Sequence, residues 1–287
     1  MSFKKILFPV DFSERSHAIA PHVRAVCNRF GASLTLVHFF HVPALAYIAP
    51  EAPLVFDFPA DELRASAEQN LARFAEESFP DMAVDKIVEE GDPGTDIAAL
   101  ARTLQVDLIM LPTRGQGRFR AALLGSVTAK TLHDAECPVW TEAHCEEAGP
   151  RHANWHTIVC AIDTTPEGVW LIRAAAELAA SIDARVSLVH ATTYADSGTG
   201  NSFELEFTEF AADRAREAVA AMQREAGTSL PVCIETGAVT DVIQHAARSL
   251  GADVVLTGRG ALPHFAGRLR SHAYSIVRDM PCPVLSF

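Results

Sequence analysis

Two hydrophobic patterns alternate along the chain. Short apolar runs, such as residues 5–10 and 108–111, have the length and continuity of strands buried on both faces of a parallel sheet. Between them lie segments of helical period, such as residues 61–79, whose apolar positions fall on one face. The first half therefore predicts, in order, strand 4–11, helix 13–31, strand 32–39, helix 61–79, strand 84–89, helix 95–104, strand 108–111, helix 126–134 and strand 138–141.

The same pattern restarts after residue 156. Four segments of the first half return in the same order, the first two at the same spacing: 5–11 at 157–163, 32–38 at 184–190, 106–110 at 252–256, and 136–139 at 281–284. Such self-similarity indicates an internal duplication. Residues 144–155 are polar and carry Gly149-Pro150, so they are predicted to link a domain at 1–143 to a second at 156–287.

Strands alternating with helices predict the fold class. Right-handed crossovers place helices on both faces of a parallel sheet. We therefore expect an α/β protein with two tandem doubly wound domains, each a five-stranded parallel sheet. Ligands of such sheets bind beyond the carboxyl ends of the strands, where the strand order reverses. If the first and fourth strands are neighbours, Asp11 and the loop before Gly125 face one crevice.

The segment 113–128 carries the candidate chemistry. It joins the fourth strand to a helix through glycines, and the Gly125-Ser126 pair stands at the helix start. Free backbone N–H groups and the positive end of the helix dipole would form a phosphate cradle there. An ordinary glycine loop with a serine cap is the alternative. Three loop arginines either support phosphate binding or are merely exposed: Arg114, Arg118 and Arg120.

Composition narrows the class of protein. The net charge of -12 argues against a general nucleic-acid binder or a binder of anionic membranes. Residues 1–5 precede no secretory apolar region and no apolar run spans a membrane, so a cytoplasmic location is expected. The six cysteines form no C-x-x-C pair and are interpreted mostly as small core residues. The histidines lack metal-ligand spacing, and His38 and His190 are interpreted as packed, hydrogen-bonded residues.

Several motifs together resemble the universal stress protein family. They are Phe8-Pro-Val-Asp11-Phe-Ser-Glu14, Gly91-Asp-Pro93, Val106-Asp-Leu-Ile-Met110, and Gly115 followed after nine residues by Gly125-Ser126-Val-Thr128. Both halves are covered, so the chain resembles a tandem member with the adenine nucleotide alpha hydrolase-like fold. In nucleotide-binding members, one loop wraps the phosphates of ATP, usually with Mg²⁺. Its pattern is Gly, two residues, Gly, nine residues, Gly, and then Ser or Thr.

The resemblance implies a set of cofactor-binding positions in the first half. Asp11 corresponds to the aspartate that contacts the ribose or adenine side, and backbone near Phe39 to the site that meets the base. The phosphate positions are Gly115, Gly125, Ser126 and Thr128. No metal ligands are assigned within the protein. Pro112 stands where the pattern begins with glycine, which removes one N–H donor.

The second half departs further from the family pattern. It reads Thr257-Gly-Arg-Gly260, the loop before Gly260 is one residue shorter, and Arg270 stands in the place of Gly125. A side chain there blocks close backbone approach to phosphate, although an arginine could replace the backbone donor. We expect a lost or altered site. Asp11 and Asp163 are either ligand contacts or helix caps. Ligand contact is favoured for Asp11 because Ser13 can also cap the helix, and capping is at least as good for Asp163.

Three functions follow as hypotheses. The first is a stress-response module that binds ATP in its first half and signals through bound nucleotide; the second is a nucleotide-free scaffold for association. The third, a slow ATPase, is disfavoured because neither a P-loop nor a nucleophile–base pair is present, and a dedicated enzyme is not expected. Val139 and Val284 are expected near an internal pairing of the two last strands, with a homodimer left open. The proline-rich residues 40–59 are interpreted as a lid or contact surface.

Overall fold

A computed structural model describes residues 1–42, 60–113, 124–143, 155–192, 202–259 and 271–287. The predicted lid at 40–59 lies almost wholly outside the described residues, as do Gly115 and Arg270. The first half contains β1 (Lys5–Pro9), α1 (Glu14–Phe30), β2 (Ser33–Phe40), α2 (Ala60–Ser78), β3 (Val84–Glu90), α3 (Pro93–Leu104), β4 (Leu108–Pro112), α4 (Ser126–Asp134) and β5 (Val139–Glu142).

The second half repeats this order. It contains β6 (Thr157–Ala161), α5 (Pro166–Ile182), β7 (Arg185–Thr192), α6 (Ser202–Ala226), β8 (Val232–Thr236), α7 (Val239–Leu250), β9 (Val254–Thr257), α8 (Ser271–Asp279) and β10 (Val284–Ser286). The expected bounds of the α4 helix are confirmed, whereas the predicted helix at 95–104 begins two residues earlier, at Pro93. That start follows from local chemistry, because Asp92 caps α3 and proline suits the first turn.

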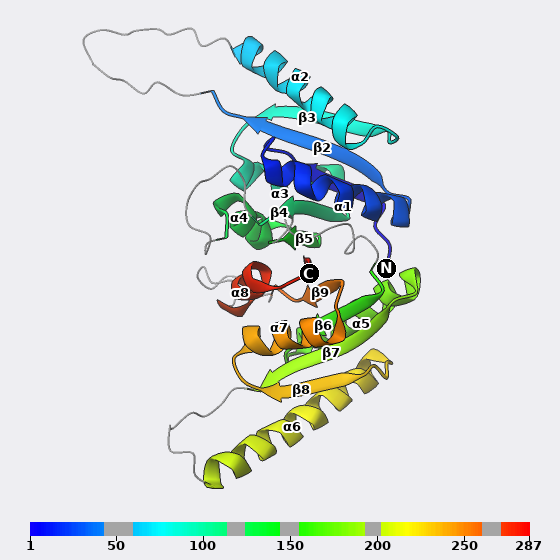
Figure 1. Cartoon of the computed structure of the whole chain (residues 1–287), viewed down its shortest axis with the longest axis vertical. Coiled ribbons are helices and arrows are strands. Elements are labelled where there is room, and N and C mark those ends of the chain that lie inside the picture. The colour runs from blue at the N-terminus through cyan, green and yellow to red at the C-terminus, as the bar shows by residue number, and fades with distance from the viewer. Residues whose placement is uncertain (43–59, 114–123, 144–154, 193–201, 260–270) are drawn as a thin grey trace, which may run out of the picture.

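The ten strands form one continuous sheet (Figure 1). Their order is β3-β2-β1-β4-β5-β10-β9-β6-β7-β8, parallel within each half and antiparallel only between β5 and β10. Each half is therefore the expected doubly wound, five-stranded parallel unit. The predicted internal pairing is also confirmed: Leu285 lies opposite Trp140, and Val284 and Val139 lie one position to either side.

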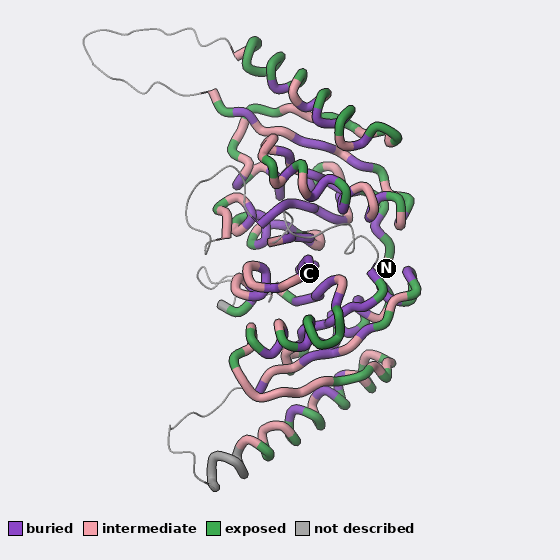
Figure 2. Tube along the Cα trace, viewed as in Figure 1, coloured by how far each residue is buried: buried purple, intermediate pink, exposed green. Residues whose placement is uncertain are grey.

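Helices cover both faces of the sheet, and the buried residues are concentrated in the strands and along one side of the helices (Figure 2). The buried side chains form two layers. Successive residues of β1 alternate, with Ile6 and Phe8 in one layer and Leu7 in the other. The first layer packs under α1, α2, α5 and α6, and the second under α3, α4, α7 and α8. Both layers include residues from both halves. Trp155, at the end of the predicted linker, is buried and packs on Phe30 of the first half.

Candidate functional site

Two strand ends meet where the order of the first half reverses. β1 pairs with β2 on one side and with β4 on the other, so Leu7 lies opposite Ile109. Asp11 follows β1, and α4 begins beyond β4. The expected adjacency of these strands is therefore confirmed, and their carboxyl ends bring the aspartate and the start of α4 to one edge of the sheet.

Asp11 is tied to the start of α1. Its Oδ1 accepts hydrogen bonds from the backbone N–H of Ser13 at 3.0 Å and from the Ser16 hydroxyl at 2.7 Å. Ser13 is the N-cap of α1, since its side chain accepts from the N–H of Ser16. The helix is therefore capped by Ser13, as expected, and the carboxylate of Asp11 is oriented by the same turn.

The backbone directly after Asp11 is strained. Phe12 has a φ of 58°, a left-handed conformation that is uncommon for a bulky residue outside a helix end. Its ring contacts the His38 imidazole, with centroids 4.4 Å apart, and also packs near Phe74. Strain of this kind persists only where the surroundings hold it, and it concentrates at functional sites. The left-handed backbone at Phe12 therefore belongs to the turn that orients the Asp11 side chain.

The two equivalent histidines have the structural role that was predicted. The His38 Nδ1 lies 2.8 Å from the carbonyl oxygen of Val10, and the His190 Nδ1 lies 2.9 Å from that of Ile162. Because a carbonyl only accepts, Nδ1 carries the proton in both rings. Each histidine therefore supports the backbone just before the strand-end aspartate.

The start of α4 differs from the starts of α1 and α3. Ser13 and Asp92 cap those helices with side-chain oxygens, whereas Gly125 is the N-cap of α4 and no side chain makes a capping hydrogen bond. The N–H of Gly125 donates to the carbonyl of Thr113, which closes the loop. Ser126 is exposed at the first position of the helix. Among the described residues, the first N–H groups of α4 therefore have no side-chain cap.

Other predicted site residues have structural partners. Thr128 is buried, and its hydroxyl donates to the carbonyl of Pro112 at 2.9 Å, which ties α4 to the end of β4. Phe39 is half-buried in β2, and its ring lies beside Gly91 at the start of α3. Gly115 and the three loop arginines lie outside the described residues.

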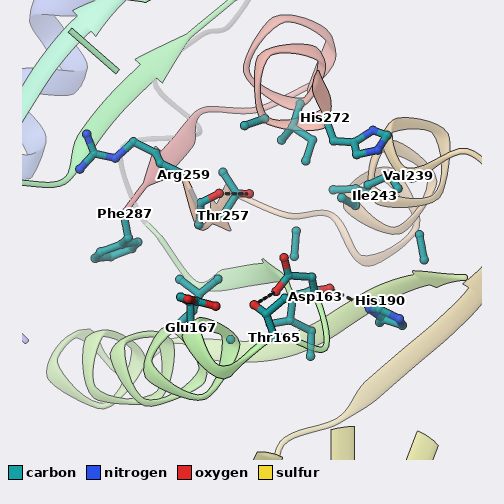
Figure 3. A pocket seen from close by; sticks show the side chains of 18 of the residues that line it. Asp163, Thr165, Glu167, His190, Val239, Ile243, Thr257, Arg259, His272 and Phe287 are labelled. Carbon is teal, nitrogen blue, oxygen red and sulfur yellow. Dashed lines mark hydrogen bonds between the residues drawn. The ribbon is translucent and has the colours of Figure 1, made fainter. Parts of the chain in front are cut away.

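A cavity of about 450 Å³ occupies the corresponding edge of the second half (Figure 3). Its lining comes from the ends of β6, β7, β9 and β10 and from α5, α7 and α8. It is surrounded by apolar side chains such as Ile243 and Ile276, by polar ones such as Thr257, by the carboxylates of Asp163 and Glu167, and by the guanidinium-bearing Arg259. The sequence did not predict this cavity, because its open space depends on side chains from distant segments.

Asp163 is placed like Asp11 but supported differently. Its Oδ1 accepts a 2.5 Å hydrogen bond from the hydroxyl of Thr165, and Thr165, not Asp163, is the N-cap of α5. The capping interpretation of Asp163 is therefore wrong, because the N-cap lies two residues later. Gly168 stands where α1 has Ser16. A Cβ there would lie 2.5 Å from the backbone oxygen of Asp163, so only glycine permits this close approach.

Arg259 joins the second half to the first. Its Nη1 donates to the carbonyls of Leu132 at 3.2 Å and Ala135 at 2.7 Å, and its Nη2 donates to that of Cys137 at 2.8 Å. These carbonyls lie at or just beyond the C-terminal end of α4, where the helix dipole favours a cation. Burial lowers the pKa of the guanidinium from its ordinary value. Arg259 thus binds the C-terminal end of α4, the helix whose start carries the predicted phosphate positions of the first half.

Most of the described cysteines are core residues, as predicted: Cys27, Cys160 and Cys282 are buried, and Cys137 and Cys233 are half-buried against the second layer. Burial raises the pKa of Cys27, Cys160 and Cys282 to about 12 and that of Cys137 to about 11. Their thiols are therefore protonated and weakly nucleophilic at neutral pH. Within the described part of the chain, no three His, Cys, Asp or Glu side chains gather as metal ligands, and no helix is long and apolar enough to span a membrane.

The fold defines a duplicated α/β protein in which each half carries an aspartate just beyond its first strand, at the carboxyl edge of a parallel sheet. The universal stress protein family model matches residues 2–141 and 154–287, so the chain belongs to this family as a tandem member. Two universal stress proteins of Methanocaldococcus jannaschii, MJ0531 and MJ0577, are 27% and 26% identical over 48% of this chain. The alignments cover 80% and 93% of those proteins.

Solved structures agree over the whole chain. A universal stress protein from Archaeoglobus fulgidus is 20% identical, with a TM-score of 0.67 over 99% of this chain and 97% of the other. A functionally unknown protein from Pseudomonas aeruginosa gives the same identity and TM-score over 99% and 92%. At this identity the likeness establishes the fold alone.

Proposed function

We propose that the first half binds ATP and that the protein acts as a nucleotide-dependent regulatory or protective module. The observation that carries this proposal is the meeting of Asp11 with an α4 helix whose start has no side-chain cap. Open N–H groups and the helix dipole favour phosphate, while a carboxylate at the neighbouring strand end can accept hydrogen bonds from ribose hydroxyls.

The described residues fit the phosphate end of such a ligand. Gly125 has no side chain to obstruct close backbone approach, and Ser126 is exposed beside it. Thr128 holds this helix start against β4 through its bond to Pro112. A Mg²⁺ ion bound with the nucleotide would neutralise phosphate charge; Gly115 and the backbone near Phe39 complete the proposed set.

Binding, rather than rapid turnover, suits these groups. The His38 Nδ1 is committed to the Val10 carbonyl, and Asp11 is held by the turn at Ser13. Neither arrangement provides a recognisable general base for water. We therefore propose that bound nucleotide acts as a signal, with partner proteins reading its presence.

The test begins with the purified full chain. Denaturation should release a nucleotide, identified by chromatography and mass spectrometry, and ATP with Mg²⁺ should raise the melting temperature. At ligand concentrations about 100 times the Kd, linkage predicts about 2.7 kcal/mol of added stability. The absence of both released nucleotide and stabilisation by ATP would contradict the proposal.

Gly125→Arg sharpens the test by copying Arg270 of the second half. We expect ATP affinity to fall by about a hundredfold, equivalent to about 2.7 kcal/mol, because a side chain obstructs the phosphate position. Ser249→Arg adds the same side chain at an exposed position of α7 and serves as the control. Unchanged ATP affinity in Gly125→Arg would favour a nucleotide-free scaffold instead.

A further inference from the structure

The second-half cavity is open where the first half carries larger side chains. The matching helices α1 and α5 and strands β2 and β7 align Phe12 with Thr164 and Phe39 with Ala191. At the start of the last helix, the buried Thr128 corresponds to Ala273. Ala191 and Ala273 both line the cavity. Smaller side chains thus contribute to a space whose volume, about 450 Å³, suits a small organic ligand.

The charges around this space disfavour phosphate. Among the described lining residues, Asp163 and Glu167 supply carboxylates, Arg259 is the permanently charged cation, and His190 and His272 supply imidazoles. The guanidinium of Arg259 points away from Asp163 toward the first half (Figure 3), where it donates to three carbonyls. Bringing a phosphate here would place it near carboxylates, with this cation already engaged elsewhere.

The mouth of the cavity is aromatic. Trp170 and Phe287 both line it, with ring centroids 5.5 Å apart in an edge-on arrangement. Trp170 is 51% exposed, although tryptophan gains from burying its large ring. The first half has Ala18 and Glu142 at the matching positions, so this aromatic pair belongs to the second half alone. Its exposed ring face suits a planar partner.

We propose that the second-half cavity binds an uncharged planar aromatic molecule carrying hydroxyl or amino donors, and that it discriminates against phosphorylated ligands. The ring system packs among Ile243, Ile276 and the aromatic pair, and its donors meet Asp163 and Thr257. The cavity therefore differs in ligand class from the ATP site proposed for the first half. This proposal stands independently of that site, since every residue it uses belongs to the second half.

Trp170 provides a local reporter for the test. The other two tryptophans, Trp140 and Trp155, are each 1% exposed, so a collisional quencher such as acrylamide acts mainly on Trp170. The full chain is titrated with adenosine and, separately, with ATP, while Trp170 fluorescence and its quenching are measured. We expect adenosine to protect Trp170 and to bind at least tenfold more tightly than ATP by this signal. Equal or tighter ATP binding, or no effect of adenosine, would overturn the proposal.

Two variants locate the ligand. Ala191→Phe introduces the ring that the first half carries at Phe39 and should weaken adenosine binding at least tenfold by filling the cavity. Asp163→Asn should also weaken binding at least tenfold, because it removes the charged acceptor. Unchanged affinity in a folded Ala191→Phe protein would place adenosine elsewhere and overturn the assignment.

Matched controls separate these effects from changes in folding. Ala221→Phe adds the same ring on an exposed position of α6, and Asp241→Asn makes the same charge change on exposed α7. Both should retain the wild-type adenosine affinity. Circular dichroism and melting temperature establish that each variant is folded before its binding is compared. Because the ATP site is tested by Gly125→Arg in the other half, the failure of one proposal is distinguishable from the failure of the other.

Discussion

The two halves share one fold but place different groups at their equivalent strand ends. The first half buries His22 against Glu142, whereas the second has Ala174 and the half-buried Phe287 at the matching positions. The first places Thr113 where the second places Arg259, whose guanidinium reaches across the sheet junction. The comparison teaches that the two halves keep one sheet while their strand-end side chains differ. Those of the second half line a cavity and join the halves, and those of the first half orient Asp11.

The largest expected effect concerns the buried pair of the first half. His22 Nδ1 lies 2.7 Å from Glu142 Oε2, and both side chains are almost fully buried. His22→Ala alone should lower the free energy of unfolding by about 3–5 kcal/mol, because it leaves a buried carboxylate without its partner. Urea denaturation measures this change.

The double variant His22→Ala/Glu142→Phe copies the second half and should recover much of that loss. Hydrophobic groups can replace a buried ion pair when they fill its volume. If the single variant loses less than about 1 kcal/mol, the pair does not stabilise the first half and this contrast between halves has no energetic basis.

The next effect concerns the connection made by Arg259. Arg259→Met keeps much of the side-chain length but leaves three carbonyls near the end of α4 without their donor. We expect the free energy of unfolding to fall by about 2–3 kcal/mol, a net loss of charged hydrogen bonds. Arg248→Met, at an exposed position of α7, should change it by less than about 0.5 kcal/mol. Equal effects of the two variants would show that the junction does not depend on Arg259.

Thr128 should contribute less than Arg259. Thr128→Ala gives the first half the residue found in the second, Ala273, and removes the 2.9 Å bond to the Pro112 carbonyl. We expect a loss of about 1–2 kcal/mol in thermal or urea unfolding, because the carbonyl loses its donor and a small space is left. Thr103→Ala, on the exposed face of α3, is the matched substitution. A loss no greater than in that control would contradict the anchoring role.

The smallest expected effect on stability concerns the N-termini of α1 and α5, which follow Asp11 and Asp163. Ser13 caps α1 with its side chain, whereas Thr165 makes no side-chain cap bond and instead donates to Asp163. Ser13→Ala should therefore cost about 1 kcal/mol of unfolding free energy. Because Thr165 does not cap, Thr165→Ala should cost less than Ser13→Ala in the same unfolding assay. The reverse order would mean that the caps are assigned incorrectly.

The sequence determined the features that depend on local pattern and repetition. Hydrophobic period placed the strands and helices, and the duplication implied two equivalent α/β units. Local chemistry indicated the Ser13 cap and the start of α4 at Ser126, because such signals act within a few residues. The internal pairing of the last strands was also anticipated, from the resemblance to a family in which this edge pairs.

Only the tertiary structure decided which distant side chains meet. Arg259 and Ala135 are separated by more than a hundred residues, and no periodicity relates a guanidinium to the carbonyls of another half's helix. The cavity likewise depends on Ala191, Ala273 and Phe287, which come together from separate elements. The His22–Glu142 pair depends on α1 packing beside the end of β5. Local patterns specify elements through nearby contacts, whereas cavities and junctions arise from packing across long sequence separations.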